Sequence, residues 1–447
     1  MKLFKNFKSH KKKFAIIQDS KKYSYDYLIK YSEKISKLIK KNSLIILISK
    51  NEIDSIAFYI SCIKNGYYLI ILDENSNKKF LLDTIKNFKP NYIFYPRKYI
   101  NLKKKNKKFS FSNYCLEEID KKEKKINVKN SIILTTSGTT SNPKFVRLSN
   151  KNLIKNTEQI IDYLNIKKND ITITTLPMAY SYGLSILNIH LEKGATIVIN
   201  NDSVFSKNFW LKIKNFKVCS FGSVPAVYDY LKKIKFENFL TPPLKYLTVA
   251  GGKTSSKTLN YLYEVCRKNN IKFFVMYGQT EASPRMSYFD LTKHPKKAGS
   301  VGKPLLNSRF ELYKDELIFY GENVSLGYAK NIKDLKKGDV NNGKIKTGDL
   351  GFKDKDNFYH IIGRKKKISK LFGLRINLSD IEKTLKKNSI NVKAIIDDEK
   401  IKIHCIKKNI ENKIKDLIFK EYKINRNYIE VKNEQDFRKN INFKNLK

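Results

Sequence analysis

The sequence has few of the residues that build disulfide frameworks or metal clusters. It contains five cysteines and five histidines in 447 residues. No two cysteines form a CxxC pair, and no histidines have HExxH spacing. An odd number of scattered cysteines in a long chain predicts reduced core thiols in a cytoplasmic protein. A disulfide scaffold and a histidine-based zinc site are therefore not expected.

Long apolar runs are also absent. No stretch of about 18 uncharged apolar residues occurs, so the sequence predicts no transmembrane helix. The basic start of the chain, residues 1–14, has no apolar run behind it and is not expected to be a signal peptide. Hydrophobic residues nevertheless make up 41% of the chain and aromatic residues 12%, which is typical of a folded globular protein. The length suffices for one large core and one smaller core.

Acidic residues are scarce beside basic ones. The 42 Asp and Glu against 90 Lys and Arg give a formal net charge of +48. Such a charge raises nucleic acid or an anionic membrane as a partner. The lysines, however, run through the whole chain among asparagine and isoleucine and form no single stripe, which favours solvated surface positions. Nucleic-acid binding stays an alternative, and a steep salt-dependent shift of a DNA or RNA fragment would support it.

Apolar segments in the first third alternate between strand-like and helix-like patterns. Residues 43–49 and 67–72 predict buried strands, and isoleucines at helical spacing predict a helix between them that ends at Gly66. The strand–helix–strand order predicts parallel α/β layers. Further strands are expected at residues 131–134, 196–200, 218–221, 246–250 and 272–276.

The pattern changes towards the C-terminus. From about residue 315 the segments become short and strand-rich, and the last part of the chain alternates strand and helix on a small scale. We therefore expect a mixed α/β fold with α+β subdomains. A large N-terminal multi-sheet domain would span residues 1–365, and a small C-terminal α+β domain would span residues 366–447.

One hydroxyl-rich segment, residues 135–144, reads T-T-S-G-T-T-S-N-P-K. It follows an expected strand and precedes a helix that Ser149 can cap. Glycine lets backbone amides approach a phosphate closely, hydroxyls donate to its oxygens, and lysine adds a positive charge. No Gly-Lys-Ser/Thr ends the segment, so it is not a Walker A loop, and alone it is equally consistent with a polar surface loop. The candidate phosphate-binding residues are Thr136, Ser137, Gly138, Thr139, Thr140 and Lys144.

This segment resembles the phosphate loop of the adenylate-forming (AMP-binding) superfamily. That superfamily includes acyl-CoA synthetases, luciferase-like enzymes and the adenylation domains of peptide synthetases. Its loop usually reads T-S-G-T-T-G-x-P-K-G, so this chain departs at Ser141 and Phe145, where glycines are usual. Both side chains would stiffen the loop. Further motifs follow in the family's order, and the resemblance extends from about Tyr23 to the C-terminus.

The segment Tyr277-Gly278-Gln279-Thr280-Glu281 is similar to the family signature Y-G-x-T-E. The resemblance implies that Tyr277 stacks on adenine, that Thr280 contacts the α-phosphate and that Glu281 holds magnesium. An aromatic face suits a purine, and a carboxylate oxygen suits a hard cation. The resemblance also assigns Gly278 to this nucleotide-binding turn.

Three weaker motifs complete the resemblance. Gly251 and Gly252 are similar to a glycine pair that lines the adenine and acyl pockets. Asp349 ends a T-G-D motif whose aspartate accepts both ribose hydroxyls in the family. Arg364 lies in a G-R-x-Lys/Asp segment, close to the ribose by resemblance, and Lys366 is the implied hinge residue between the large domain and a small lid domain.

The resemblance implies a two-step reaction with ATP and Mg²⁺ as cofactors. A carboxylate attacks the α-phosphorus, pyrophosphate leaves, and the acyl group then passes to the thiol of coenzyme A or of a carrier-protein phosphopantetheine. The small domain rotates between the steps. Lys370 is expected to serve thioester formation, or is a surface lysine. A positive field would concentrate ATP, coenzyme A or an acidic carrier protein.

The C-terminal tail departs most from the family pattern. The family places a catalytic lysine in a motif like N-G-K-I-D, whereas aligning Ile441 here puts Asn440 at the lysine position. Either Lys439 substitutes from one residue away, or the first step lacks this group. Asparagine has no positive charge, so transition-state stabilisation would fall by about 2–4 kcal/mol, by analogy with the loss of one oxyanion donor.

The acid pocket is expected along residues 177–184 and 220–225. Tyr180 stands where an aromatic gate is common, and Phe221 and Gly222 belong to a second wall. Plain core packing is the alternative for both aromatic residues. Amino-acid-activating relatives carry an aspartate at the position of Gly183 to bind the substrate ammonium. Because glycine has no charge, an unpaired ammonium there would be costly, which argues against an ordinary amino acid substrate.

The favoured function is an AMP-forming acyl-CoA synthetase acting in fatty acid metabolism in the cytoplasm. Its expected partners are a small carboxylic acid and either coenzyme A or an acidic carrier protein. A ligase that loads a carrier-protein thiol is one alternative. A degenerate, non-catalytic nucleotide-binding homologue is another, supported by Ser141, Phe145 and Asn440. Pyrophosphate exchange with a panel of acids separates an enzyme from such a homologue.

Overall fold

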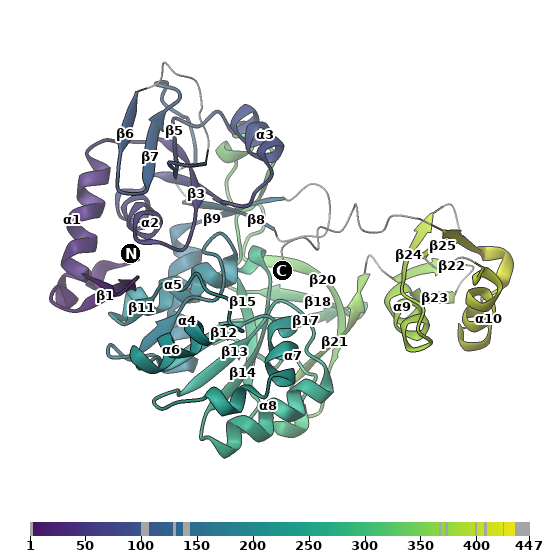
Figure 1. Cartoon of the computed structure of the whole chain (residues 1–447). Coiled ribbons are helices and arrows are strands. Elements are labelled where there is room, and N and C mark those ends of the chain that lie inside the picture. Colours follow the sequence, from purple (N-terminus) through teal and green to yellow (C-terminus); the bar gives the residue numbers. More distant parts are fainter. Residues whose placement is uncertain are drawn as a thin grey trace. The chain divides into compact units, whose positions relative to one another are not determined.

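A computed structural model of the chain describes residues 3–99, 107–127, 131–136, 144–365, 368–371, 374–397, 400–405, 409–422 and 424–433 (Figure 1). The chain divides into two compact units. The large unit comprises Met1–Glu311, Ile318–Ile345 and Lys353–His360, and the small unit comprises Leu312–Leu317, Lys346–Phe352 and Ile361–Lys447. The boundary expected between residues 365 and 366 stays a prediction. Among the described helices, none has the length and apolar character needed to cross a membrane.

The first sheet of the large unit has eight strands in the order β19-β9-β8-β4-β3-β5-β7-β6. Its centre, β8-β4-β3-β5, is parallel. The expected strands at 43–49 and 67–72 are confirmed as β3 and β4, and the helix between them ends at Gly66, whose φ is 75°. The strands are β3 (Leu44–Ser49), β4 (Tyr68–Asp73), β5 (Tyr92–Pro96), β6 (Lys108–Ser110), β7 (Tyr114–Glu118), β8 (Ile132–Thr135), β9 (Phe145–Leu148) and β19 (Gly327–Ala329).

Helices cover both faces of this sheet because its central strands are apolar on both sides. Helices α1 and α2 share one core with β3 and β4, and α3 contributes to the core on the opposite face. These helices are α1 (Tyr25–Ser36), α2 (Ile53–Asn65) and α3 (Lys78–Phe88).

The second sheet of the large unit has nine strands in the order β16-β15-β14-β13-β12-β10-β11-β1-β2. Strands β14, β13, β12, β10, β11 and β1 run parallel, and the strands at both edges are antiparallel. The strands are β1 (Phe14–Gln18), β2 (Lys21–Ser24), β10 (Ile171–Ile173), β11 (Thr196–Val198), β12 (Ser220–Ser223), β13 (Tyr246–Val249), β14 (Lys272–Gly278), β15 (Arg285–Asp290) and β16 (Lys303–Pro304).

Five helices cover this sheet. Helices α6, α7 and α8 share a core with one face, and α4 and α5 pack on the other (Figure 1). Helix α5 also contributes to the core of the first sheet, so it lies between the two sheets and is buried along most of its length. The helices are α4 (Asn150–Leu164), capped by Ser149 as expected, α5 (Ser181–Lys193), α6 (Lys207–Asn215), α7 (Pro225–Lys233) and α8 (Ser256–Lys268).

A four-stranded sheet, β17-β18-β20-β21, has strands that belong partly to each unit. The small unit adds the hairpin β22–β23 and the sheet β24-β25-β26, whose core includes apolar residues of α9 and α10. These elements are β17 (Arg309–Tyr313), β18 (Glu316–Tyr320), β20 (Lys344–Lys353), β21 (Tyr359–Arg364), β22 (Ile368–Leu371), β23 (Leu374–Asn377), α9 (Leu378–Lys387), β24 (Val392–Asp397), β25 (Lys400–Cys405), α10 (Glu411–Tyr422) and β26 (Ile429–Asn433).

The expected mixed α/β fold is confirmed. Short 3-10 helices connect several elements, namely η1 (Lys5–His10), η2 (Phe236–Phe239), η3 (Thr280–Ala282), η4 (Pro295–Lys297), η5 (Ile332–Lys336) and η7 (Arg426–Tyr428). The five cysteines are buried, as the sequence predicted.

Candidate active site

The hydroxyl-rich segment connects the two strands of a β-hairpin. Strands β8 and β9 pair antiparallel, with Thr135 opposite Phe145. The Thr136 N–H donates to the Lys144 carbonyl at 2.9 Å, and the Lys144 N–H donates to Thr136 Oγ1 at 3.2 Å. The two ends of the candidate phosphate loop are therefore held side by side. The expected contacts Ser137, Gly138, Thr139 and Thr140, and the departure Ser141, lie outside the described residues.

Lys144 and Glu281 both contact the side chain of Tyr328. The Lys144 Nζ lies 4.7 Å from the centre of the Tyr328 ring, and the Tyr328 hydroxyl donates to Glu281 Oε1 at 2.6 Å. Partial burial, followed by the charge of Glu281 and its hydrogen bond, raises the pKa of Tyr328 well above its ordinary value. The hydroxyl therefore remains a donor at neutral pH. A cation and a carboxylate are thus linked through one aromatic side chain.

Strand pairing places Tyr328 at this position. Strand β19 runs antiparallel to β9, with Tyr328 opposite Val146. The buried guanidinium of Arg147 donates to the carbonyls of Leu326, Lys337 and Gly338. These hydrogen bonds hold the segment around β19 in place. The Ser325 N–H also donates to the Glu281 carbonyl at 2.8 Å. Segments far apart in the sequence are therefore held together by buried hydrogen bonds.

The Y-G-Q-T-E motif spans the end of β14 and the turn η3. The Tyr277 ring lies 6.1 Å from the Phe310 ring, centre to centre. Thr280 is buried, and its hydroxyl lies 3.3 Å from the Ser181 hydroxyl at the start of α5. The motif thus joins the second sheet to the helix that carries the expected acid-pocket segment.

Glycines bring the expected acid-pocket walls close together. A Cβ on Gly251, whose φ is +90°, would lie 2.7 Å from the Tyr180 hydroxyl. A Cβ on Gly222 would lie 2.5 Å from the hydroxyl of Tyr182, which is hydrogen-bonded to the Thr248 hydroxyl at 2.6 Å. The tyrosine hydroxyls therefore occupy the space that side chains at these two glycines would fill. Gly252 follows at the same turn, and its Cβ would meet only Pro225, at 3.4 Å.

Gly183 has no room for a side chain. A Cβ there would come within 3.0 Å of the backbone of Leu176 and Pro177. A carboxylate at this position, as in amino-acid-activating relatives, therefore does not fit the backbone. Phe221 is fully buried and packs against Phe209, Trp210 and Tyr228 in the core. Its assignment to a pocket wall stays a prediction.

Asp349 and Arg364 form an ion pair within the small unit. The Arg364 Nε lies 2.7 Å from Asp349 Oδ1, and Nη1 donates to the Thr347 carbonyl at 3.3 Å. The Asp349 side chain is nearly buried, whereas that of Arg364 is 57% exposed. The aspartate expected at the ribose is therefore held by the arginine expected beside it.

The carboxylate of Glu281 is linked to the loop end at Lys144 through Tyr328. In the described ranges there is no group of three or more His, Cys, Asp or Glu side chains that could hold a metal. Mg²⁺ is commonly bound by one or two carboxylates together with substrate phosphates. The donor set present therefore suits a magnesium ion carried by a nucleotide better than a metal bound by protein alone.

Three site residues are expected near the C-terminus, namely Lys366, Lys370 and Lys439. Lys366 and Lys439 lie outside the described residues, as does Asn440, the departure from the family motif. Lys370 lies in β22, opposite Arg375 of β23. Their roles stay predictions.

The sequence did not predict that Tyr328 would lie at the candidate site. A single tyrosine in a three-residue strand has no distinctive spacing, and only the pairing of β19 with β9 brings it between Lys144 and Glu281. No periodicity in the sequence could have indicated this contact.

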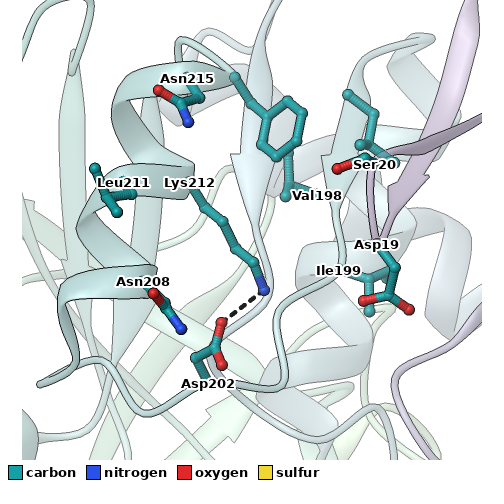
Figure 2. A pocket seen from close by; sticks show the side chains of 11 residues that line it. Asp19, Ser20, Val198, Ile199, Asp202, Asn208, Leu211, Lys212 and Asn215 are labelled. Carbon is teal, nitrogen blue, oxygen red and sulfur yellow. Dashed lines mark ion pairs between the residues drawn. The ribbon is translucent and has the colours of Figure 1, made fainter.

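A separate surface pocket of about 240 Å³ lies between the β1–β2 turn and α6 (Figure 2). Figure 2 shows Lys212 extending from α6 to Asp202, with which it forms an ion pair of 2.7 Å. None of the residues that line this pocket belongs to the expected nucleotide or acid site.

The large unit thus combines two sheets, a helix between them, and a hairpin that carries the candidate phosphate loop beside Glu281. The family model for AMP-binding enzymes matches residues 3–328. The chain therefore belongs to the AMP-binding enzyme family.

The chain is similar to several CoA ligases. Oxalate–CoA ligase of Arabidopsis thaliana is 29% identical, and the match covers 57% of this chain and 52% of that protein. Probable 4-coumarate–CoA ligase 2 of Dictyostelium discoideum is 31% identical, over 57% of this chain and 48% of that protein. The chain matches about half the length of these curated relatives.

Solved structures share the fold. The o-succinylbenzoate CoA synthetase of Bacillus subtilis in complex with AMP has a TM-score of 0.76 at 17% identity, over 98% of this chain and 95% of that chain. The same enzyme with its acyl-adenylate intermediate has a TM-score of 0.72 at 18% identity, over 94% and 92%. The likeness covers both units and confirms the two-domain fold.

Proposed function

We propose that the chain is an ATP-dependent acid–thiol ligase, which joins a carboxylic acid to AMP and then passes the acyl group to coenzyme A. The observation that carries this proposal is the contact chain from Lys144 through Tyr328 to Glu281. A lysine neutralises phosphate charge, and a carboxylate binds the magnesium that accompanies a triphosphate. The B. subtilis synthetase with the same fold has been solved with ATP and a magnesium ion.

Five residues of the candidate site have a role in this proposal. Lys144 would stabilise the negative charge of the leaving pyrophosphate, and Thr280 would donate to the α-phosphate. Glu281 would hold the magnesium, and the Tyr328 hydroxyl would fix the orientation of that carboxylate. Tyr277 would offer an aromatic face to the adenine.

The acid is proposed to lack an α-ammonium group. Gly183 leaves no space for the carboxylate that would balance such a group. The relatives that match this chain are named as ligases of oxalate, 4-coumarate and 2-succinylbenzoate, which are acids without an amino group. Coenzyme A is the proposed acceptor because these relatives are CoA ligases. The cytoplasmic location and a place in fatty acid metabolism stay predictions.

Pyrophosphate exchange with a panel of carboxylic acids tests the proposal. We expect magnesium-dependent exchange with at least one acid, and acyl-thioester formation when coenzyme A is added. Transfer to a carrier protein but not to coenzyme A would change the proposed acceptor and leave the first step intact. ATP binding without exchange for any acid would contradict the ligase proposal and favour a non-catalytic nucleotide-binding homologue. The same assay on Lys439→Ala tests whether that lysine serves the first step.

A further inference from the structure

Two buried hydroxyl groups from distant parts of the chain meet at the turn that carries the Y-G-Q-T-E motif. Ser181 is the first residue of α5, and Thr280 is the first residue of η3. Their side-chain oxygens lie 3.3 Å apart, and the two residues are 4% and 6% exposed. Within the described part of the chain, neither hydroxyl has another hydrogen-bond partner. Each hydroxyl therefore depends on the other for its hydrogen bonding.

Backbone hydrogen bonds hold both residues in place. The Leu184 N–H donates to the Tyr180 carbonyl at 2.9 Å, which begins α5 at Ser181. In η3 the Ala282 N–H donates to the Gln279 carbonyl at 2.9 Å. Helix α5 is itself buried along most of its length between the two sheets. The contact between the two hydroxyls therefore joins a rigid helix to a closed turn.

Ser185 shows what a buried serine hydroxyl does one turn further along the same helix. It is 4% exposed, and its Oγ donates to the Tyr182 carbonyl three residues earlier at 2.7 Å. The residues three and four positions before Ser181 precede the helix, so Ser181 has no such carbonyl in α5. Its proton is therefore available to Thr280.

The direction of this hydrogen bond follows from the role proposed for Thr280. A hydroxyl has one proton to donate and two lone pairs with which to accept. An ionised α-phosphate oxygen only accepts, so a Thr280 hydroxyl that contacts it donates its one proton there. Thr280 can then meet Ser181 only as an acceptor, and Ser181 has to be the donor. A hydrogen bond received by Thr280 also makes its own proton a stronger donor.

We propose that Ser181 is a positioning residue for the first step of the reaction. Its hydroxyl would donate to Thr280 Oγ1 and so direct the Thr280 proton towards the α-phosphate, where negative charge develops as the acid attacks. Both protons stay on their own oxygens throughout. This inference rests on the proposed ligase function and adds to it a residue from the segment expected to form the acid pocket.

A double-mutant cycle of Ser181→Ala and Thr280→Val tests this role. In magnesium-dependent pyrophosphate exchange, we expect Ser181→Ala to lower kcat/KM for ATP about threefold to tenfold, the range of one neutral hydrogen bond. We expect no further loss when Thr280→Val is already present, because Ser181 acts through that hydroxyl. Ser181→Cys should lie between the wild type and Ser181→Ala, since a thiol is a weak donor.

α-Thio-ATP gives a second readout that a purely structural role would not change. In its two diastereomers, sulfur replaces one or the other non-bridging oxygen of the α-phosphate. Sulfur is a weak hydrogen-bond acceptor, so the wild type should discriminate against the diastereomer that places sulfur at Thr280. Ser181→Ala should reduce this discrimination, because Thr280 is then a weaker and less directed donor. This readout decides the question if Thr280→Val is too slow for the cycle.

Controls separate this inference from the proposed function. Ser185→Ala removes a buried hydroxyl of the same helix and should leave both readouts unchanged. No effect of Ser181→Ala, or an equal loss with and without Thr280→Val, would overturn the inference and leave the ligase function in place. Urea unfolding checks each variant, and Ser181→Cys replaces Ser181→Ala in the cycle if the latter does not fold. Absence of exchange by the wild type with every acid would instead contradict the ligase function itself.

Discussion

The Tyr328 hydroxyl donates a hydrogen bond to Glu281 Oε1 at 2.6 Å, while Lys144 lies over the other part of the same side chain, its aromatic ring. The strand that carries Tyr328 pairs with β9, which begins directly after Lys144. One tyrosine thus links the end of the candidate phosphate loop to the expected magnesium ligand. The position of the carboxylate depends on a residue outside the family motifs identified in the sequence.

Removing the Tyr328 hydroxyl should impair the first step without unfolding the protein. Tyr328→Phe keeps the ring under Lys144 but removes the donor to Glu281, so the carboxylate loses its fixed orientation. We expect pyrophosphate exchange to fall about tenfold, equivalent to one hydrogen bond to a charged group, and the magnesium concentration for half-maximal rate to rise. Tyr230→Phe is the matched control, since both tyrosines are 45% exposed. Equal rates in the two variants would show that the Tyr328 hydroxyl has no role.

Adding a side chain at Gly183 should destabilise the large unit. The Cβ of Gly183→Ala would press on the backbone of Leu176 and Pro177, which cannot move as a flexible side chain can. Overpacking of this kind costs about 1–3 kcal/mol in free energy of unfolding. Gly338→Ala is the control, because its Cβ would meet no atom within 4 Å. Urea unfolding measures both, and a Gly183→Ala variant as stable as the wild type would disprove the steric argument.

His190 should weaken the fold as the pH falls. Its ring is buried in α5, where Nδ1–H donates to the Ile186 carbonyl at 2.8 Å and Nε2 accepts from the Tyr246 hydroxyl at 3.3 Å. Burial lowers the pKa of His190 from 6.5 to about 4. Between these values the unfolded chain binds more protons than the folded chain, so stability is fully present above the unfolded pKa and is lost as the pH falls towards the folded pKa.

Across the whole interval between the two pKa values, the free energy of unfolding falls by about 3 kcal/mol. His190→Asn keeps a donor for the Ile186 carbonyl but does not titrate. We expect its free energy of unfolding to decline less than that of the wild type between about pH 7 and about pH 4. Parallel curves for the two proteins would contradict a neutral, buried His190.

Asp349 should affect nucleotide binding through the ribose. Arg364 holds one oxygen of this carboxylate, and the resemblance to the family assigns it to both ribose hydroxyls. Asp349→Asn should weaken ATP binding about tenfold, because a charge-assisted hydrogen bond is replaced by a neutral one. Calorimetry with 2′,3′-dideoxy-ATP is the control, since that nucleotide has no ribose hydroxyl that could donate to residue 349. An equal loss for both nucleotides would assign Asp349 a purely structural role.

Local patterns predicted much of the fold. The apolar runs of β3 and β4, the stop at Gly66 and the cap at Ser149 are all encoded within a few residues, and each was confirmed. Expected strand bounds differ from the observed ones by up to two residues, as at β12, because fraying and pairing decide where a strand ends. The family motifs located the ends of the loop and the Glu281 turn.

Contacts between segments far apart in the chain could not be predicted from the sequence. Tyr328 lies 184 residues after Lys144 in the chain (328 − 144 = 184), and the two meet only because β19 adds to the edge of β9. Arg285 looks like an ordinary surface cation in a lysine-rich chain, and its burial becomes evident only when α4, α5 and β15 are assembled. Both residues depend on tertiary packing, which no periodicity records.

Calorimetric titration of ATP, with and without Mg²⁺, into the wild type and Glu281→Gln tests the central claim most directly. The claim is that a magnesium-bound triphosphate binds between Lys144 and Glu281. We expect magnesium-dependent binding to the wild type and an affinity at least about tenfold lower in Glu281→Gln, because the amide has no charge for the cation. Equal affinity in the two proteins, or no ATP binding by the wild type, would contradict the account.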